Sequence, residues 1–326
     1  MLDWGRRLRA LGVVGLNARN LDYINQHNER SRFPLVDDKL QTKLAARRHG
    51  ITTPELLGVI RSQSGIREFD AMIANHPGFA IKPARGSGGK GILVIDAHDG
   101  GRFRKASGHW MTRERVVRYL SNLLSGLYTL GGRPDVAVIE ALIRPEERMI
   151  GFSHEGVPDV RIVIHRGYPV MAMTRLSTQA SDGKANLHQG AIGVGLDLTT
   201  GRAVHAVQYD RPIRTHPDTG AALDQLFIEN WRELLELAAG CYEMSGLGYL
   251  GVDMVLDREQ GPMLLELNAR PGLSIQMANG CGLRPRCDRI AQWERERMAA
   301  EALPPAAAER VTRVQDELVT GPGDVP

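Results

Sequence analysis

The spacing of apolar residues along the chain predicts a mixture of short strands and amphipathic helices. Alternating or short apolar runs mark strands at 78–83, 92–95, 136–140, 160–165, 168–173, 250–256 and 262–268. Helical spacing predicts helices at 37–50, 112–131 and 228–238, a charged helix around 293–298, and another within 1–35. Hairpin-like strands interspersed with helices favour the α+β class over a doubly wound parallel sheet.

These segments divide the chain into four expected parts. Residues 1–36 form a helical extension, 37–137 a first subdomain with a glycine-rich loop, and 138–290 a second subdomain. Residues 291–326 hold the charged helix and an Ala/Pro/Gly-rich tail that we expect to be disordered. A chain of 326 residues is long enough to bury a full core.

Composition and charge narrow the class of protein. Apolar residues at 42% and charged residues at 24% are typical of a globular protein. A net charge of +3 gives no reason to expect nucleic acid as a partner, and no apolar run is long enough for a membrane span. The three cysteines lack a CxxC pair, which favours a reduced, cytoplasmic protein. The sequence leaves open whether the protein forms a homo-oligomer.

The last two predicted strands carry a set of oxygen ligands. Alternation places Glu266 and Asn268 on one strand face, and Asp253 lies in the preceding strand. If the two strands pair, two carboxylates and an amide oxygen converge, which suits Mg²⁺. The alternative is an exposed strand face whose acids pair with Arg258 or Arg270.

A glycine-rich loop at 84–91 lies between two predicted strands. It is not a Walker P-loop, because Gly91 follows Lys90 and a strand comes next instead of a helix. A Rossmann fingerprint fails for the same reason. A hairpin flap over a nucleotide remains, with Lys82 directed at the phosphates and the backbone of the loop around them: Gly86, Ser87, Gly88 and Gly89. A glycine-rich turn without a ligand is the alternative.

The flap and the oxygen ligands together form the two halves of an expected nucleotide cleft. Their order along the chain resembles the ATP-grasp superfamily, above all its ribosomal-protein glutamate ligase branch. The beginning of the chain also looks like a related subgroup of sugar-transfer-associated ATP-grasp proteins. The resemblance runs from about residue 37 to 272 and includes Asp38-Lys39, Lys82, Glu140, Asp159-Val160-Arg161, Asn186 to Gly190, Asp253, and Glu266 to Gly272.

The resemblance implies a two-subdomain α+β fold that grips ATP, and roles for individual residues. Lys39 and Lys82 would hold the phosphates, and Asp159 would lie near the ribose. Asp253, Glu266 and Asn268 would bind two Mg²⁺ ions, for which Mn²⁺ is an acceptable substitute. The hinge whose backbone reads the adenine edge would consist of Ile139, Glu140, Ala141 and Leu142.

Three further residues would act on the substrate. Arg161 and Arg175 would hold its carboxylate and the charge that develops in phosphoryl transfer, and Asn186 would contact phosphate or metal-bound oxygen. Ion pairs with Asp159 or nearby acids are the alternative for both arginines. His165 and His188 are expected to be structural or rim residues.

The implied reaction joins a small-molecule or peptide carboxylate to an amine through an acyl phosphate, with release of ADP and phosphate. Gln189 replaces an arginine of the ribosomal-protein branch, which puts glutamate as the substrate in doubt. Two alternatives stay open: a phosphotransferase acting on a hydroxyl group, and a non-catalytic ATP-binding partner of a surface-polysaccharide system.

Overall fold

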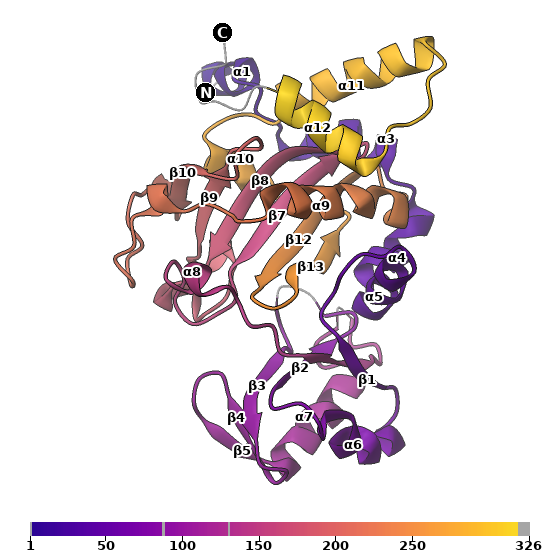
Figure 1. Ribbon diagram of the computed structural model, residues 1–326, viewed down its shortest axis with the longest axis vertical. Coiled ribbons are helices and arrows are strands. Elements are labelled where there is room, and N and C mark those ends of the chain that lie inside the picture. Colours follow the sequence, from indigo (N-terminus) through magenta and orange to yellow (C-terminus); the bar gives the residue numbers. More distant parts are fainter. Residues whose placement is uncertain (1, 87–88, 130, 319–326) are drawn as a thin grey trace.

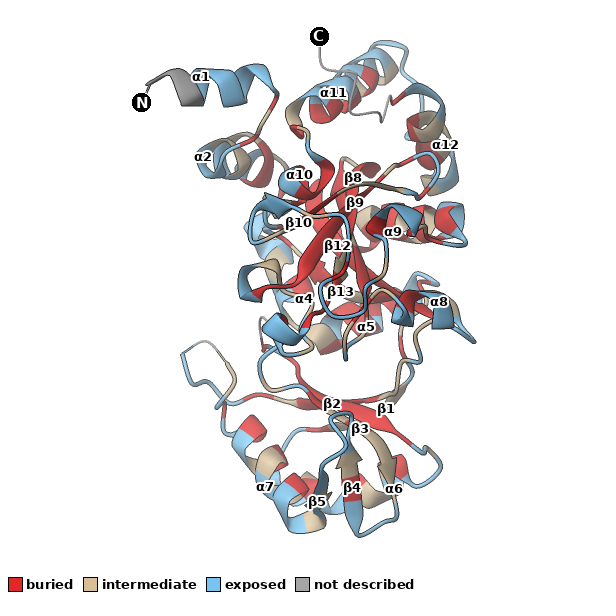
Figure 2. Ribbon diagram, turned by 90° about the vertical axis from the view of Figure 1, so that its left-hand side faces the viewer, coloured by how far each residue is buried: buried red, intermediate tan, exposed pale blue. Residues whose placement is uncertain are grey.

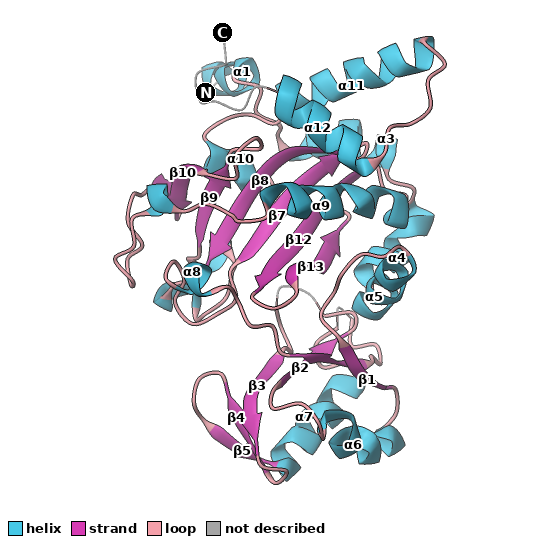
Figure 3. Ribbon diagram, in the orientation of Figure 1, coloured by secondary structure: helices cyan, strands magenta, loops and turns pink. Residues whose placement is uncertain are grey.

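The computed structural model describes residues 2–86, 89–129 and 131–318. Ser87 and Gly88, predicted to belong to the phosphate-covering loop, lie outside the described residues. The described chain forms two lobes stacked along the long axis of the molecule, each built on an antiparallel sheet (Figures 1 and 3). The expected α+β class is confirmed, because helices and all-antiparallel sheets occur in both lobes.

The smaller lobe has a six-stranded sheet in the order β1-β6-β2-β3-β4-β5. Helix α7 covers one face because Val116, Leu120 and Leu123 recur at helical spacing and are fully buried beneath it. Helix α6 packs beside it, as Figure 1 shows. The bounds are β1 (Leu56–Ile60), β2 (Phe79–Pro83), β3 (Leu93–His98), β4 (Arg102–Lys105), β5 (Trp110–Thr112), β6 (Ala137–Ala141), α6 (Phe69–Ile73) and α7 (Arg113–Leu124).

The larger lobe has a seven-stranded sheet in the order β11-β10-β9-β8-β7-β12-β13. Every residue of β12 is buried, which requires cover on both faces of the sheet. The strands are β7 (Asp159–His165), β8 (Tyr168–Leu176), β9 (Ile192–Leu196), β10 (Ala203–Gln208), β11 (Arg211–Pro212), β12 (Tyr249–Asp257) and β13 (Gly261–Asn268). Figure 2 shows these central strands as buried, whereas the helices expose their outward faces.

Helices cover this larger sheet from several parts of the chain. Helix α9 crosses one face beside α12, and α10 lies against β8, β9 and β10 (Figure 1). Among the described helices, none is both long and apolar enough to span a bilayer. The bounds are α8 (Glu147–Ile150), α9 (Trp231–Ser245), α10 (Ser274–Asn279), α11 (Arg284–Ala299) and α12 (Ala307–Glu317).

The N-terminal extension belongs to the core of the larger lobe. Asn28 is buried and bonds the first residue of β12, because its Nδ2 donates to Tyr249 O at 2.7 Å and its Oδ1 accepts from Tyr249 N at 2.9 Å. Tyr23 and Ile24 join the same hydrophobic core. The extension runs through α1 (Leu2–Ala10), α2 (Leu16–Ala18), a π-helix (Arg19–Ile24), α3 (Asn25–His27), a 3-10 turn (Arg30–Arg32), α4 (Phe33–Asp37) and α5 (Lys39–Arg48).

Residues 307–317 of the C-terminal tail are helical, where we expected disorder. They form α12, in which Val311 and Val314 are fully buried. Arg310 is also buried, and its Nε donates to Gly167 O at 2.9 Å. The prediction was wrong for this segment because its alanines, read as low complexity, are good helix formers beside an apolar stripe.

Candidate active site between the two lobes

The predicted flap is a hairpin in the structure. Strands β2 and β3 pair antiparallel on either side of the glycine-rich loop. Alternation along β2 buries Phe79 and Ile81 in the core of the smaller lobe and turns Lys82 to the opposite sheet face. At the end of the loop, Gly91 has φ +71°, and a Cβ there would come within 2.3 Å of the Tyr128 ring. Glycine is therefore required at this position.

Lys82 shares a buried carboxylate with a second lysine. Its Nζ lies 2.5 Å from Glu140 Oε2, and Lys43 Nζ of α5 lies 2.9 Å from Glu140 Oε1. Burial alone would raise the pKa of Glu140, but the two lysines outweigh it and lower that pKa. Burial lowers the pKa of Lys43. Two ammonium groups against one carboxylate leave an excess positive charge, which suits an anionic ligand.

Lys39 connects the flap to the larger lobe. Its Nζ donates to Gly86 O at 2.6 Å and lies 3.9 Å from Glu266 Oε1 of β13. Asp38 caps α5 by accepting from the amides of the next turn, and its Oδ2 accepts from Arg85 Nε at 3.2 Å. The start of α5 therefore places an ammonium group between the base of the glycine loop and a proposed metal ligand.

A second charged cluster lies on β7, β8 and β12. Arg161 pairs with Asp253 through two bonds of 2.7 and 2.6 Å, and Arg175 bonds both Asp159 and Asp253. Burial would raise the pKa of Asp253, yet the two guanidinium groups hold it at about 2. Burial, with added repulsion from Asp253, raises the pKa of Asp159 despite its pairing with Arg175.

The proposed metal ligands converge as alternation predicted, but they are not equally free. Asp253 pairs with Glu266 across the strands, and Asn268 Nδ2 donates to Asp253 Oδ2 at 3.3 Å. That bond leaves the Asn268 Oδ1 available, and the Glu266 side chain is 35% exposed. Glu266 and Asn268 thus fit a hard cation, whereas both oxygens of Asp253 already bond guanidinium groups.

The predicted hinge, residues 139–142, consists of the last three residues of β6 and the residue after it. The Ile139 side chain is fully buried in the core of the smaller lobe, and its backbone is paired with β1 on one side and β2 on the other. Ala141 and Leu142 line a cavity of about 440 Å³ with Met263 of β13. Lys82 and Glu266 do not line this cavity.

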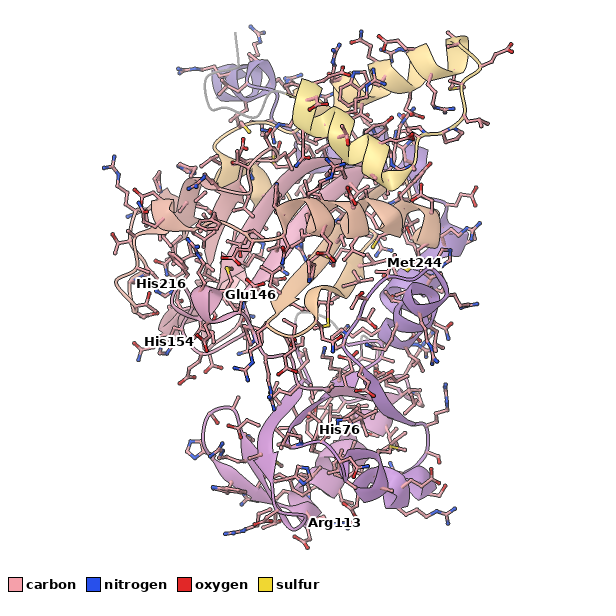
Figure 4. All side chains as sticks on the ribbon, in the orientation of Figure 1. His76, Arg113, Glu146, His154, His216 and Met244 are labelled. Atoms are coloured by element: carbon pink, nitrogen blue, oxygen red, sulfur yellow. The ribbon has the colours of Figure 1, made fainter. Side chains whose placement is uncertain are left out.

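The junction around this cavity is built from both lobes. Arg144 N donates to Asp257 Oδ2 at 2.8 Å, and Leu264 N donates to Thr52 O at 2.8 Å. His76, which Figure 4 labels in the smaller lobe, also lines the cavity. These bonds link the segment after the hinge to the end of β12, and the segment before β1 to β13.

Some predicted residues lie apart from this cluster. The Asn186 side chain accepts from His188 N at 3.1 Å and caps a short 3-10 turn, with no bond to Arg161 or Arg175. His188 is exposed on that turn. His165 is buried among the rings of Tyr23, His27 and Tyr249, which fits the structural role expected for it. Sequence reasoning missed Lys43, although it stands one helical turn after Lys39.

Comparison with known proteins agrees with this architecture. A family model described as sugar-transfer associated ATP-grasp matches residues 18–292. The chain belongs to the sugar-transfer associated ATP-grasp family. The predicted resemblance and the ATP-grasp fold are therefore confirmed.

Individual relatives of this ATP-grasp chain are distant. A probable alpha-L-glutamate ligase from Parasynechococcus marenigrum (strain WH8102) is 24% identical over 299 residues, which cover 90% of this chain and 47% of that protein. This chain thus spans about half the length of that curated relative. The ATP-grasp ligase PsnB, solved with a minimal precursor, is 15% identical with a TM-score of 0.46, covering 82% of this chain and 63% of PsnB. The D-cycloserine synthetase DcsG is 16% identical with a TM-score of 0.45, covering 81% of this chain and 71% of DcsG.

Proposed function

We propose that this chain is an ATP-dependent carboxylate–amine ligase that forms ADP. The observation that carries the proposal is the position of Lys39, whose Nζ lies 2.6 Å from Gly86 O of the flap and 3.9 Å from Glu266 Oε1. One ammonium group thus adjoins both halves of the expected nucleotide cleft. Family membership and the ligase relatives support the same reaction class.

The residues of the chain would hold ATP from both lobes. Lys39 and Lys82 supply positive charge at the base of the flap, and the hinge at Ala141 and Leu142 offers its backbone to the adenine. Asp159 is proposed to lie near the ribose. Closing of the flap would exclude water from the reacting groups.

Glu266 and Asn268 would hold Mg²⁺, with Asp253 as a third ligand that must share its oxygens with Arg161 and Arg175. Bound Mg²⁺ would neutralise charge on the ATP phosphates. The number of ions, two, and the use of Mn²⁺ in place of Mg²⁺ remain part of the proposal.

The reaction would proceed in two displacements. An oxygen of the substrate carboxylate attacks the γ-phosphorus, and the bond from that phosphorus to the bridging oxygen of ADP breaks. The nitrogen of the amine then attacks the carbonyl carbon of the acyl phosphate, phosphate leaves, and the amine proton passes to phosphate or water. Arg161 and Arg175 would stabilise the charge that develops in the first step, and Asn186 would contact the phosphate. The bonds of the two arginines to Asp159 and Asp253 support a positioning role for them as well.

Hydroxylamine trapping tests the reaction class. We expect the parent chain, supplied with Mg²⁺, ATP and a panel of amino acids, short peptides and sugar acids, to give ADP and a hydroxamate with at least one acid. Glu266→Gln should lose turnover by at least a hundredfold, because it removes a metal-binding carboxylate. Glu236→Gln is the matched control, since Glu236 forms a surface pair with Arg232 on α9.

Other product patterns would refute the proposal. AMP with pyrophosphate would exclude an acyl phosphate, and a stable phosphorylated product without hydroxamate would indicate the phosphotransferase alternative. Tight nucleotide binding without ADP release, with every acid in the panel, would favour a non-catalytic ATP-binding protein.

A further inference from the structure

A second cavity lies beside the loop that follows the proposed metal ligands. It has a volume of about 610 Å³, within the usual range for small-molecule sites. The N-terminal extension forms most of it, and Arg270 completes it. The lining residues are Arg19, Asn20, Ile24, Asn25, Asn28, Arg30, Phe33 and Arg270. Three of these are arginines, and none of the described lining residues is acidic.

The arginines of this cavity differ in what they bind within the protein. Arg19 is occupied, because its NH1 donates to Pro271 O at 3.1 Å and its NH2 donates to Asn20 Oδ1 at 2.9 Å. Arg270 lies over the Phe33 ring at 4.6 Å and is 4.0 Å from Asp37, with about half its side chain exposed. The Arg30 side chain has no hydrogen bond or ion pair to another described residue.

The backbone of the cavity wall is unusual. Residues Arg19–Ile24 form a π-helix, a rare conformation that is frequent at functional sites. Asn28 forms a rigid floor, since its side chain bonds Tyr249 and Ala269 and leaves no free donor. Among the described residues, none bonds the Asn25 side chain or the Asn20 Nδ2, so both are free to bond a ligand. The cavity therefore offers cations, amides and an aromatic ring together.

The cavity is close to the proposed site of reaction. Phe33 lines it at the start of α4, and Lys39, which adjoins Glu266, stands six residues later. Helix α4 ends at Asp37 and α5 begins at Lys39 after the extended Asp38, so the two positions lie on separate helices that pack against each other. Figure 1 shows α3, α4 and α5 in sequence along the side of the larger sheet next to β13. Arg270, which also lines the cavity, follows Asn268 by two residues and lies 4.0 Å from Asp37, so the cavity adjoins the proposed metal ligands.

We propose that this cavity binds the acid substrate by a second anionic group, a carboxylate or a phosphate, held by Arg30 and Arg270. Guanidinium groups bind both anions in bidentate geometry, and an unpaired arginine is available to do so. The substrate class is therefore an acidic molecule about the size of a sugar acid or a dipeptide. This inference rests on the proposed ligase function, because it assigns the far end of the molecule whose other carboxylate reacts.

Calorimetric titration of the whole chain tests the cavity, with glucuronate, glucose 6-phosphate and neutral glucose as probes. We expect at least one anionic probe to bind in preference to glucose. Arg30→Gln and Arg270→Gln should each weaken that binding at least tenfold. Arg32→Gln is the matched control, since Arg32 is exposed on the same turn but does not line the cavity. Preference for glucuronate or for glucose 6-phosphate distinguishes a carboxylate from a phosphate ligand.

The same titrations with Mg²⁺ and a non-hydrolysable ATP analogue separate this inference from the proposed function. All three arginine variants should bind the analogue as the parent does. Failure of the parent to bind the analogue would count against the proposed function, while the probes would still test the cavity. The inference is overturned if glucose binds as well as both anions, or if Arg32→Gln weakens binding as much as Arg30→Gln.

Discussion

At the scale of single residues, buried polar groups show how the N-terminal extension is joined to the larger lobe. His165, at the end of β7, packs edge-on against Tyr23 with ring centroids 5.6 Å apart and against His27 at 5.0 Å. Burial, with repulsion from His27 and Arg166, lowers the pKa of His165 from 6.5 to about 3. The imidazole is therefore neutral in the folded protein throughout the physiological range, which excludes it as a proton donor there.

This shift predicts that the protein loses stability in mild acid. Below pH 6.5 His165 is protonated in the unfolded chain, whereas in the folded chain it stays neutral down to about pH 3. The free energy of unfolding therefore falls as the pH falls. Between pH 7.5 and 5.0 the loss from this residue is about 2 kcal/mol. Urea unfolding of the parent and of His165→Gln checks it: the variant should lose about 2 kcal/mol less over that interval. An equal loss in both proteins would contradict the prediction.

The alternation of side chains along a strand predicted the positions of site residues correctly where the strands are regular. Glu266 and Asn268 emerge beside Asp253 because β12 and β13 form a simple hairpin, which the sequence predicts directly. The pairing of Asp253 with Arg161 and Arg175 joins β12 to the hairpin β7–β8, which precedes it by many residues in the sequence. From the sequence, ion pairs of these arginines with acids could be stated only as an alternative, because the order of strands in a sheet does not follow from the local pattern of residues.

At the scale of elements, the periodic segments were predictable and the short or irregular ones were not. All seven predicted strands exist, with ends shifted by at most a few residues. Six strands of the described chain were missed. Strands β4, β5 and β11 are short and polar, with β4 reading Arg-Phe-Arg-Lys. Strands β1 and β9 are apolar but contain glycine, which weakens a strand signal, and β10 is a short run of Ala and Val around His205. The π-helix was missed because its spacing differs from the helical repeat. These elements depend on their neighbours more than on their own sequence.

Helix α12 yields a prediction about stability. Val314 is fully buried, whereas Ala308 is exposed near the start of the same helix. Val314→Asp should reduce the free energy of unfolding by about 3 kcal/mol, because it buries an unpaired carboxylate or detaches the helix. Ala308→Asp should change it by less than about 1 kcal/mol, since an acid in the first helical turn is favourable. Urea unfolding that gives equal values for both variants would show that α12 does not pack as described.

At the scale of the whole molecule, the proposed nucleotide site depends on how the two lobes meet. Residues of the hairpin β2–β3 and of β13 lie far apart in the sequence, and only the folded chain brings Lys39 near both Gly86 and Glu266. The sequence indicated both halves of the cleft by their residue types. It did not reveal the cavity formed by the N-terminal extension, because that cavity requires Arg270 and the first 33 residues to fold together.

The most direct test is a crystal structure of the chain with Mg²⁺ and a non-hydrolysable ATP analogue. We predict a single triphosphate between the lobes, with the Nζ atoms of Lys39 and Lys82 within about 3 Å of its oxygens. Mg²⁺ should lie between those oxygens and the side chains of Glu266 and Asn268. A nucleotide bound elsewhere, touching neither Lys82 nor a metal on Glu266, would contradict the account.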